Sequence, residues 1–151
     1  MRAVIQRVTE AAVSAAPDAS GPFEETGRIG PGLVVLVGAT HDDDTATATR
    51  LAERVWQLRV FDDADGVANL SAEDLGAELL VVSQFTLYAD TRKGRRPSYV
   101  RAARPDVAEP LIERVVARLA ELGATVATGR FRSAMRVHLV NDGPWTVSLE
   151  V

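Results

Sequence analysis

The chain offers few side chains that could carry out covalent chemistry. It has no cysteine, which excludes a thiol nucleophile, a disulfide framework and a zinc-thiolate site. The hydroxyl groups of Ser83 and Thr86 are the obvious nucleophile candidates, but a hydroxyl must be activated by an adjacent base and an orienting group. Only two histidines exist, His41 and His138, and the apolar neighbours of His138 favour a structural or surface role. The sequence shows no recognisable Ser-His-Asp arrangement.

Ser83 and Gln84 lie at the end of an apolar, β-rich stretch that runs from Glu78 to Thr86. Where a buried strand ends in polar residues and continues into a loop, its backbone N–H groups are held at fixed positions. Fixed N–H groups are what an oxyanion hole requires. A site of this kind can hydrolyse an activated ester without a nucleophile of its own.

Positive charge is concentrated in one segment of an otherwise acidic chain. The net charge is −4, yet residues 92–104 contain no acid. Exposed charges act over about a Debye length of 8 to 10 Å, so a local basic patch can bind phosphates despite the acidic average. A solvated arginine loop is the alternative reading. The basic residues of this segment are Arg92, Lys93, Arg95, Arg96, Arg101 and Arg104.

The acids Asp42, Asp43 and Asp44 precede a helical pattern predicted over residues 44–59. Three adjacent carboxylates could be mistaken for a metal site. Carboxylates at the start of a helix lie next to the positive end of its dipole and satisfy unpaired N–H groups. We therefore predict capping and no metal centre.

Hydrophobic periodicity predicts the elements that must position these groups. The alternation of residues 2–13 predicts a strand with Ala3, Ile5 and Arg7 on one face. At 151 residues the chain has the length of one domain. We expect residues 1–151 to form a single α/β domain with two main helices packed on largely antiparallel sheets. The other predicted strands are 23–29, 33–37, 78–86, 125–128, 136–140 and 145–151, with a turn at 141–144 between the last two.

A second helix is predicted over residues 107–122. Asp106 and Glu109 have capping-box spacing, and Gly123 is the predicted stop. Pro110 fits only in the first turn, where the missing N–H and the ring do least damage. No stretch approaches the roughly 18 apolar residues of a membrane span, and the amino terminus lacks a signal-peptide pattern, so a cytosolic location is expected.

Two separated segments carry a family resemblance. SQFTLYADTRKGRRPS at 83–98 and NDGPWT at 141–146 resemble the motifs of the D-aminoacyl-tRNA deacylase family, and the likeness extends to the opening MRAVIQRV and to residues 27–38. The resemblance implies a cytoplasmic homodimer that hydrolyses the ester of D-aminoacyl-tRNA, and of glycyl-tRNA, without a cofactor or metal. It also implies that the basic residues Arg92, Lys93, Arg95 and Arg96 bind the tRNA.

The resemblance assigns roles to the first motif. Ser83, Gln84, Phe85 and Thr86 form the pocket for the aminoacylated 3′-adenosine, with the main-chain N–H of Phe85 as an oxyanion donor. The 2′-hydroxyl of that adenosine assists the reaction, which would explain the missing triad. Thr86 as a direct nucleophile is the alternative.

In the second motif, Gly143 and Pro144 are implied to form a cis peptide that enters the active site of a partner subunit. Rigid main chain there would leave no space for the side chain of an L-amino acid, so selection is by steric rejection. Asn141 belongs to the same motif. Arg7 is implied to hold the incoming loop, against the alternative of a solvated strand residue. Met135 is implied to lie near the pocket, against plain packing.

Three residues depart from the family pattern. Arg132 and Ser133 stand where the family usually shows Gly-Ala, and Trp145 stands where a small aliphatic residue is common. These changes affect the fit around the 3′ end and the preferred side chain, and Arg132 could add a phosphate contact. Two rival functions remain open at this point: a non-catalytic nucleic-acid-binding protein that uses residues 92–104, and a hydrolase of another small ester or amide on the same scaffold.

Overall fold

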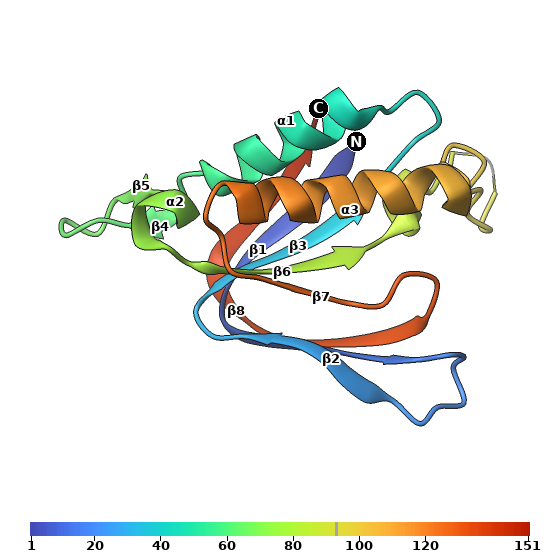
Figure 1. Ribbon diagram of the computed structural model, residues 1–151, viewed down its shortest axis with the longest axis horizontal. Coiled ribbons are helices and arrows are strands. Elements are labelled where there is room, and N and C mark those ends of the chain that lie inside the picture. Colours follow the sequence, from blue (N-terminus) through green and yellow to red (C-terminus); the bar gives the residue numbers. More distant parts are fainter. Residues whose placement is uncertain (93) are drawn as a thin grey trace.

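The computed structural model describes residues 1–92 and 94–151 of the chain. Within these residues a six-stranded mixed sheet carries helices on one face (Figure 1). Its strands are β1 (Arg2–Ala16), β2 (Glu24–Ile29), β3 (Gly32–Gly38), β6 (Glu78–Ser83), β7 (Val126–Thr128) and β8 (Ala134–Glu150). The helices are α1 (Thr45–Trp56), α2 (Ala72–Leu75) and α3 (Pro105–Glu121), with a short 3₁₀ turn η1 (Phe85–Tyr88). A separate hairpin is formed by β4 (Phe61–Asp62) and β5 (Ala68–Leu70).

Strand β1 organises the sheet. Its first half, from Arg2 to Val8, pairs antiparallel with β3, and its second half, from Ala11 to Ala15, pairs antiparallel with β2. Along its other edge β1 pairs antiparallel with β8. The ladders β3 to β6 and β6 to β7 are parallel. The mixed α/β class with a largely antiparallel sheet, predicted from the sequence, is confirmed.

Helices α1 and α3 lie side by side across one face of the sheet (Figure 1). Leu51 and Val55 of α1 and Val115 and Leu119 of α3 are fully buried in the core between helices and sheet. Each such side chain contributes roughly 1.5–3 kcal/mol when removed from water. A smaller core that includes Val34 and other strand residues lies on the opposite face. None of the helices in the described residues is long and apolar enough to cross a membrane.

One residue of the acidic triplet, Asp44, caps α1 as predicted. Asp44 is the N-cap residue, and its carboxylate accepts hydrogen bonds from the backbone N–H of Thr47 at 2.8 Å and from the Thr47 hydroxyl at 2.7 Å. These bonds hold the pKa of Asp44 below its ordinary value. Asp43 instead accepts from the Met1 ammonium at 2.6 Å and from the backbone N–H of Thr40 at 2.7 Å. The helix ends at Trp56, three residues before the predicted end.

The predicted start of α3 was wrong. The helix begins at Pro105, because proline at the first helical position has a suitable φ and no N–H to satisfy. Arg104 is the N-cap and makes no side-chain capping bond, so the capping box of Asp106 and Glu109 is not formed. Pro110 therefore lies inside the helix, beyond the first turn, on its exposed face.

Candidate active site

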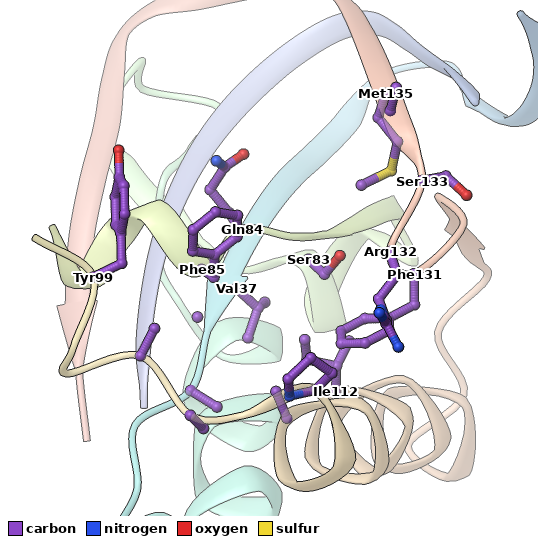
Figure 2. Close-up of a pocket in the computed structure, with 17 residues that line it drawn as sticks. Val37, Ser83, Gln84, Phe85, Tyr99, Ile112, Phe131, Arg132, Ser133 and Met135 are labelled. Carbon is purple, nitrogen blue, oxygen red and sulfur yellow. The ribbon is translucent and has the colours of Figure 1, made fainter. Parts of the chain in front are cut away.

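A cavity of about 700 Å³ opens between the sheet and the start of α3 (Figure 2). The segments that lead into α3 and into β8 also line it. Its walls are mostly apolar, and they come from β3, the end of β6, the approach to α3, and the start of β8. The lining residues are Val37, Gly38, Ala39, Ser83, Gln84, Phe85, Tyr99, Ala102, Ala103, Pro105, Ala108, Ile112, Phe131, Arg132, Ser133, Ala134 and Met135.

The turn after β6 forms part of one wall of the cavity. The predicted strand to Thr86 ends at Ser83, and Gln84 leads into the 3₁₀ turn. The backbone N–H of Gln84 donates to the carbonyl of Val37 at 2.7 Å, which fixes the turn to β3. A Cβ on Gly38 would lie only 2.9 Å from the Gln84 carbonyl oxygen. The close approach of strand and turn therefore depends on glycine at this position.

The main-chain N–H of Phe85 is a candidate hydrogen-bond donor to a ligand. It belongs to the first residue of η1, where a helical N–H has no partner within its own turn. Among residues 1–92 and 94–151, none accepts a hydrogen bond from it. The Phe85 side chain lines the cavity and is 57% exposed, and its ring meets that of Tyr99 edge-on with centroids 5.1 Å apart. A donor of this kind suits a developing oxyanion.

Thr86 is differently placed from its neighbours in the motif. It does not line the cavity, and its hydroxyl accepts a hydrogen bond from the side-chain amide of Gln84. Neither histidine lines the cavity, and His41 Nε2 lies 2.8 Å from the carbonyl oxygen of Val100. Among the described residues the Thr86 hydroxyl has no hydrogen-bond acceptor that could serve as its base, which disfavours the direct-nucleophile alternative.

Met135 lies at the opposite wall of the cavity, on the first residues of β8 (Figure 2). A Cβ on Gly129 would stand 2.6 Å from the Met135 sulfur, so the methionine packs directly over a glycine. Both interpretations of Met135 therefore apply, since it packs against Gly129 and also lines the cavity.

The predicted turn at 141–144 does not join two separate strands. Thr146 pairs with Gln6 and Asn141 pairs with Val8, so both flanks of the motif pair with β1 in the same direction. The prediction of a reversing turn was wrong, because β8 continues in the same direction through this segment and forms a β-bulge opposite β1. Residues 142–145 stand opposite the single residue 7 of β1.

The bulge presents Gly143 and Pro144 to the surface. Both residues are exposed, and the peptide bond between them is cis. Neither residue lines the cavity of its own chain. A Cβ on Gly143 would have ample space, since the nearest atom, Asn141 Oδ1, is 3.9 Å away.

Arg7 anchors the bulge from beneath. It is buried, which excludes the solvated-strand alternative, and its Nε lies 2.8 Å from a carboxylate oxygen of Asp142. One terminal nitrogen donates to the Val60 carbonyl at 2.8 Å and lies 3.2 Å from Asp62. The guanidinium also lies over the Trp145 ring at 5.6 Å. In the single chain, Arg7 thus holds its own loop, and the expected contact with a partner's loop stays a prediction.

Asn141 completes the anchor. Its side-chain amide donates to the carbonyl of Arg7 at 2.8 Å and to the carbonyl of Trp145 at 3.3 Å. The amide therefore ties both ends of the bulge to β1. This contact explains in structural terms why the motif needs an amide at its first position.

The basic segment leads from the first motif to the cavity. Arg92, Arg95 and Arg96 are exposed, and Lys93 lies outside the described residues. Arg92 pairs with Asp90 at 2.6 Å, and its hydrogen bonds hold the pKa of Asp90 far below its ordinary value. Part of the charge of Arg92 is thereby neutralised within the chain.

The end of the basic segment is fixed at the cavity. The backbone N–H of Ala103 donates to the carbonyl of Ala39 at 2.9 Å. Sequence reasoning missed the residues of this segment and of α3 that line the cavity, including Tyr99 and Ile112. Tyr99 could have been noticed because it directly follows the first motif, which ends at Ser98. It also lies inside the acid-free basic segment 92–104.

The fold and this site define a small α/β protein with a mostly apolar cavity beside the turn that follows β6. The model of the D-Tyr-tRNA(Tyr) deacylase family matches residues 4–150. A D-aminoacyl-tRNA deacylase from Streptomyces avermitilis is 56% identical over 151 residues, covering 99% of each chain. One from Nocardia farcinica is 55% identical over 150 residues, covering 99% of each chain.

Two solved structures share the fold of this chain. The c-Myc DNA unwinding element binding protein is 34% identical, with a TM-score of 0.90 over 100% of this chain and 99% of its own. A probable eukaryotic D-amino acid tRNA deacylase, 15% identical with a TM-score of 0.81 over 99% of this chain and 98% of its own, shares the fold. The chain belongs to the D-Tyr-tRNA(Tyr) deacylase family. The predicted enzyme class, a hydrolase of ester bonds, is confirmed.

Proposed function

We propose that this protein hydrolyses the ester that joins a D-amino acid, or glycine, to the 3′ end of tRNA. The products are the free amino acid and reusable tRNA, so the reaction serves translation quality control in the cytoplasm. The family match and the relatives named D-aminoacyl-tRNA deacylase support the proposal.

The observation that carries the mechanism is the unbonded main-chain N–H of Phe85, a residue that lines the cavity. Among the described residues nothing accepts a hydrogen bond from it, and the lining side chains include no carboxylate and no histidine. The protein can therefore stabilise the oxyanion of a tetrahedral intermediate but offers no activated nucleophile there. The group that assists attack belongs to the substrate, and the 2′-hydroxyl of the terminal adenosine is adjacent to the ester.

Chirality is enforced by the bulge of a second copy of the chain. Gly143 and Pro144 are exposed, lie outside the cavity of their own chain, and are held from beneath by Arg7. In a homodimer the bulge of one protomer enters the cavity of the other and faces the α-carbon of the acyl group. The side chain of an L-residue would collide with main chain there, whereas glycine has no side chain to reject.

The basic segment binds the RNA. Arg95 and Arg96 are exposed, and the same segment continues into the lining of the cavity at Tyr99. Lys93 and the partly neutralised Arg92 belong to the same stretch. This stretch binds phosphates near the 3′ end and thereby presents the ester to the cavity.

The direct test is to time deacylation of D-tyrosyl-tRNA and L-tyrosyl-tRNA side by side. We expect rapid loss of the D-ester and retention of the L-ester, with inhibition by uncharged tRNA. Comparable rates for the two esters would refute the steric account. Binding without turnover would support the rival non-catalytic nucleic-acid-binding protein. Failure of uncharged tRNA to compete would support a hydrolase of other small esters.

A further inference from the structure

The cavity wall is charged at one place. Of the 17 residues that line the cavity in the described part of the chain, Arg132 alone carries a charge. No carboxylate of the described residues forms an ion pair with it. In Figure 2, Arg132 lies beside Phe131 at one end of the cavity, and Phe85 lies toward the other. An unpaired guanidinium at an apolar cavity is a binding group for an anion.

The backbone at Arg132 is unusual. Its φ of 56° is the only positive value at a non-glycine residue in the described chain. A side chain in this left-handed region costs on the order of 1 kcal/mol, and glycine would be the residue of choice. The turn is nevertheless closed by a backbone hydrogen bond from Ser133 to the carbonyl of Arg130 at 3.4 Å. An arginine in this conformation at a cavity wall motivates a hypothesis about what its side chain binds.

The charge around Arg132 continues beyond the cavity. Residues 122–141 include Arg130, Arg132 and Arg136 and contain no acid, and residues 91–105, of which Tyr99 and Pro105 line the cavity, contain no acid either. Arg130 is exposed, whereas Arg136 stacks on the Phe23 ring at 3.9 Å. Positive charge that extends from the lining outward matches a chain of phosphates better than one carboxylate on an acyl group.

We propose that Arg132 binds the 5′-phosphate of the terminal nucleotide of the RNA ester. This inference rests on the proposed function, because it assumes that the terminal nucleoside occupies the cavity. The phosphate lies at the same place in every aminoacyl-tRNA, so one fixed guanidinium can serve all acyl groups. Two parallel N–H donors of arginine suit phosphate oxygens. Arg132 thereby adds a phosphate contact where the family pattern has none.

Small nucleotides test the contact without turnover. Calorimetry on the full chain should show that adenosine 5′-monophosphate binds about tenfold more tightly than adenosine, as expected for a hydrogen bond to a charged group. Arg132→Gln and Arg132→Gly should abolish this preference, and Arg132→Lys should keep part of it. The glycine variant suits the left-handed backbone and protects the test against misfolding. Arg130→Gln, two residues away and outside the lining, is the matched control and should keep the preference.

Two outcomes would overturn the proposal. One is an equal affinity of the wild type for the two nucleotides, or a preference that survives in Arg132→Gln. The other is a selective loss of D-aspartyl-tRNA hydrolysis in Arg132→Gln with D-tyrosyl-tRNA unaffected, which would assign Arg132 to the acyl carboxylate. An Arg132-dependent preference in a protein that hydrolyses no D-ester would support the phosphate site while refuting the deacylase function.

Discussion

Replacing Phe85 by proline removes the proposed oxyanion donor and leaves the rest of the cavity in place. Proline is tolerated in the first turn of a helix, and the N–H of Phe85 has no helical partner to lose. The Phe85 side chain is 57% exposed, so its loss alone has little effect on stability. Loss of one oxyanion donor typically lowers kcat by about 10²- to 10³-fold. We expect this loss for Phe85→Pro.

The matched control is Phe85→Ala, which keeps the N–H and loses only the ring and its edge contact with Tyr99. Single-turnover deacylation of D-tyrosyl-tRNA should be measured for both variants, with urea unfolding to confirm that both are folded. Alanine should retain activity within about tenfold of the wild type, since it keeps the donor. If proline and alanine variants hydrolyse the ester at similar rates, the N–H of residue 85 does not stabilise the transition state.

Three further predictions concern the loop, the basic segment and a buried phenol. Gly143→Val should change the free energy of unfolding by no more than about 0.5 kcal/mol, because the nearest atom to a new Cβ is 3.9 Å away, yet it should abolish deacylation. Neutralising Arg95 and Arg96 together should weaken tRNA binding and lower the slope of log affinity against log salt by about 1–2, whereas Arg50→Gln on α1 should not. Burial raises the pKa of Tyr88 from 10.0 to about 12, so its protonated form stabilises the fold below pH 10. That contribution is lost as pH rises toward 12, and Tyr88→Phe should show a shallower decline in urea-unfolding stability over this range.

Local patterns were enough to predict most of the sheet and the position of both main helices. The alternation of Ala3, Ile5 and Arg7 correctly placed all three on a buried face of β1. The run Leu33 to Val37 correctly predicted a strand buried on both faces, because only apolar residues fit there. Helix boundaries were less predictable, since Pro105 and Asp106 both signal a start and the helix begins at the proline.

The site could be predicted only in part, because its parts depend on contacts far apart in the sequence. Of the four residues predicted from the first motif, Ser83, Gln84 and Phe85 line the cavity and Thr86 does not, and their roles stay predictions. The bulge of β8 could not be predicted from residues 141–146 alone, because a Gly-Pro pair in a sequence is typical of a reversing turn. Only the pairing of both flanks with β1 shows that the strand continues. Arg7, on the buried face of β1, gave a clue to the contacts that hold the bulge, because a buried guanidinium needs hydrogen-bond acceptors.

The separation of loop and cavity within one chain leads to a test of the shared site. Phe85→Pro disables a cavity but leaves its own bulge intact, whereas Gly143→Val disables a bulge but leaves its own cavity intact. Each variant alone should form inactive dimers. When equal amounts are unfolded and refolded together, half of the dimers are expected to be mixed, and each mixed dimer has one intact cavity facing one intact bulge. Activity should therefore recover to about a quarter of the wild-type value. A mixture that stays as inactive as its two components, although mixed dimers are detected by mass spectrometry, would show that the loop does not act across the subunit boundary.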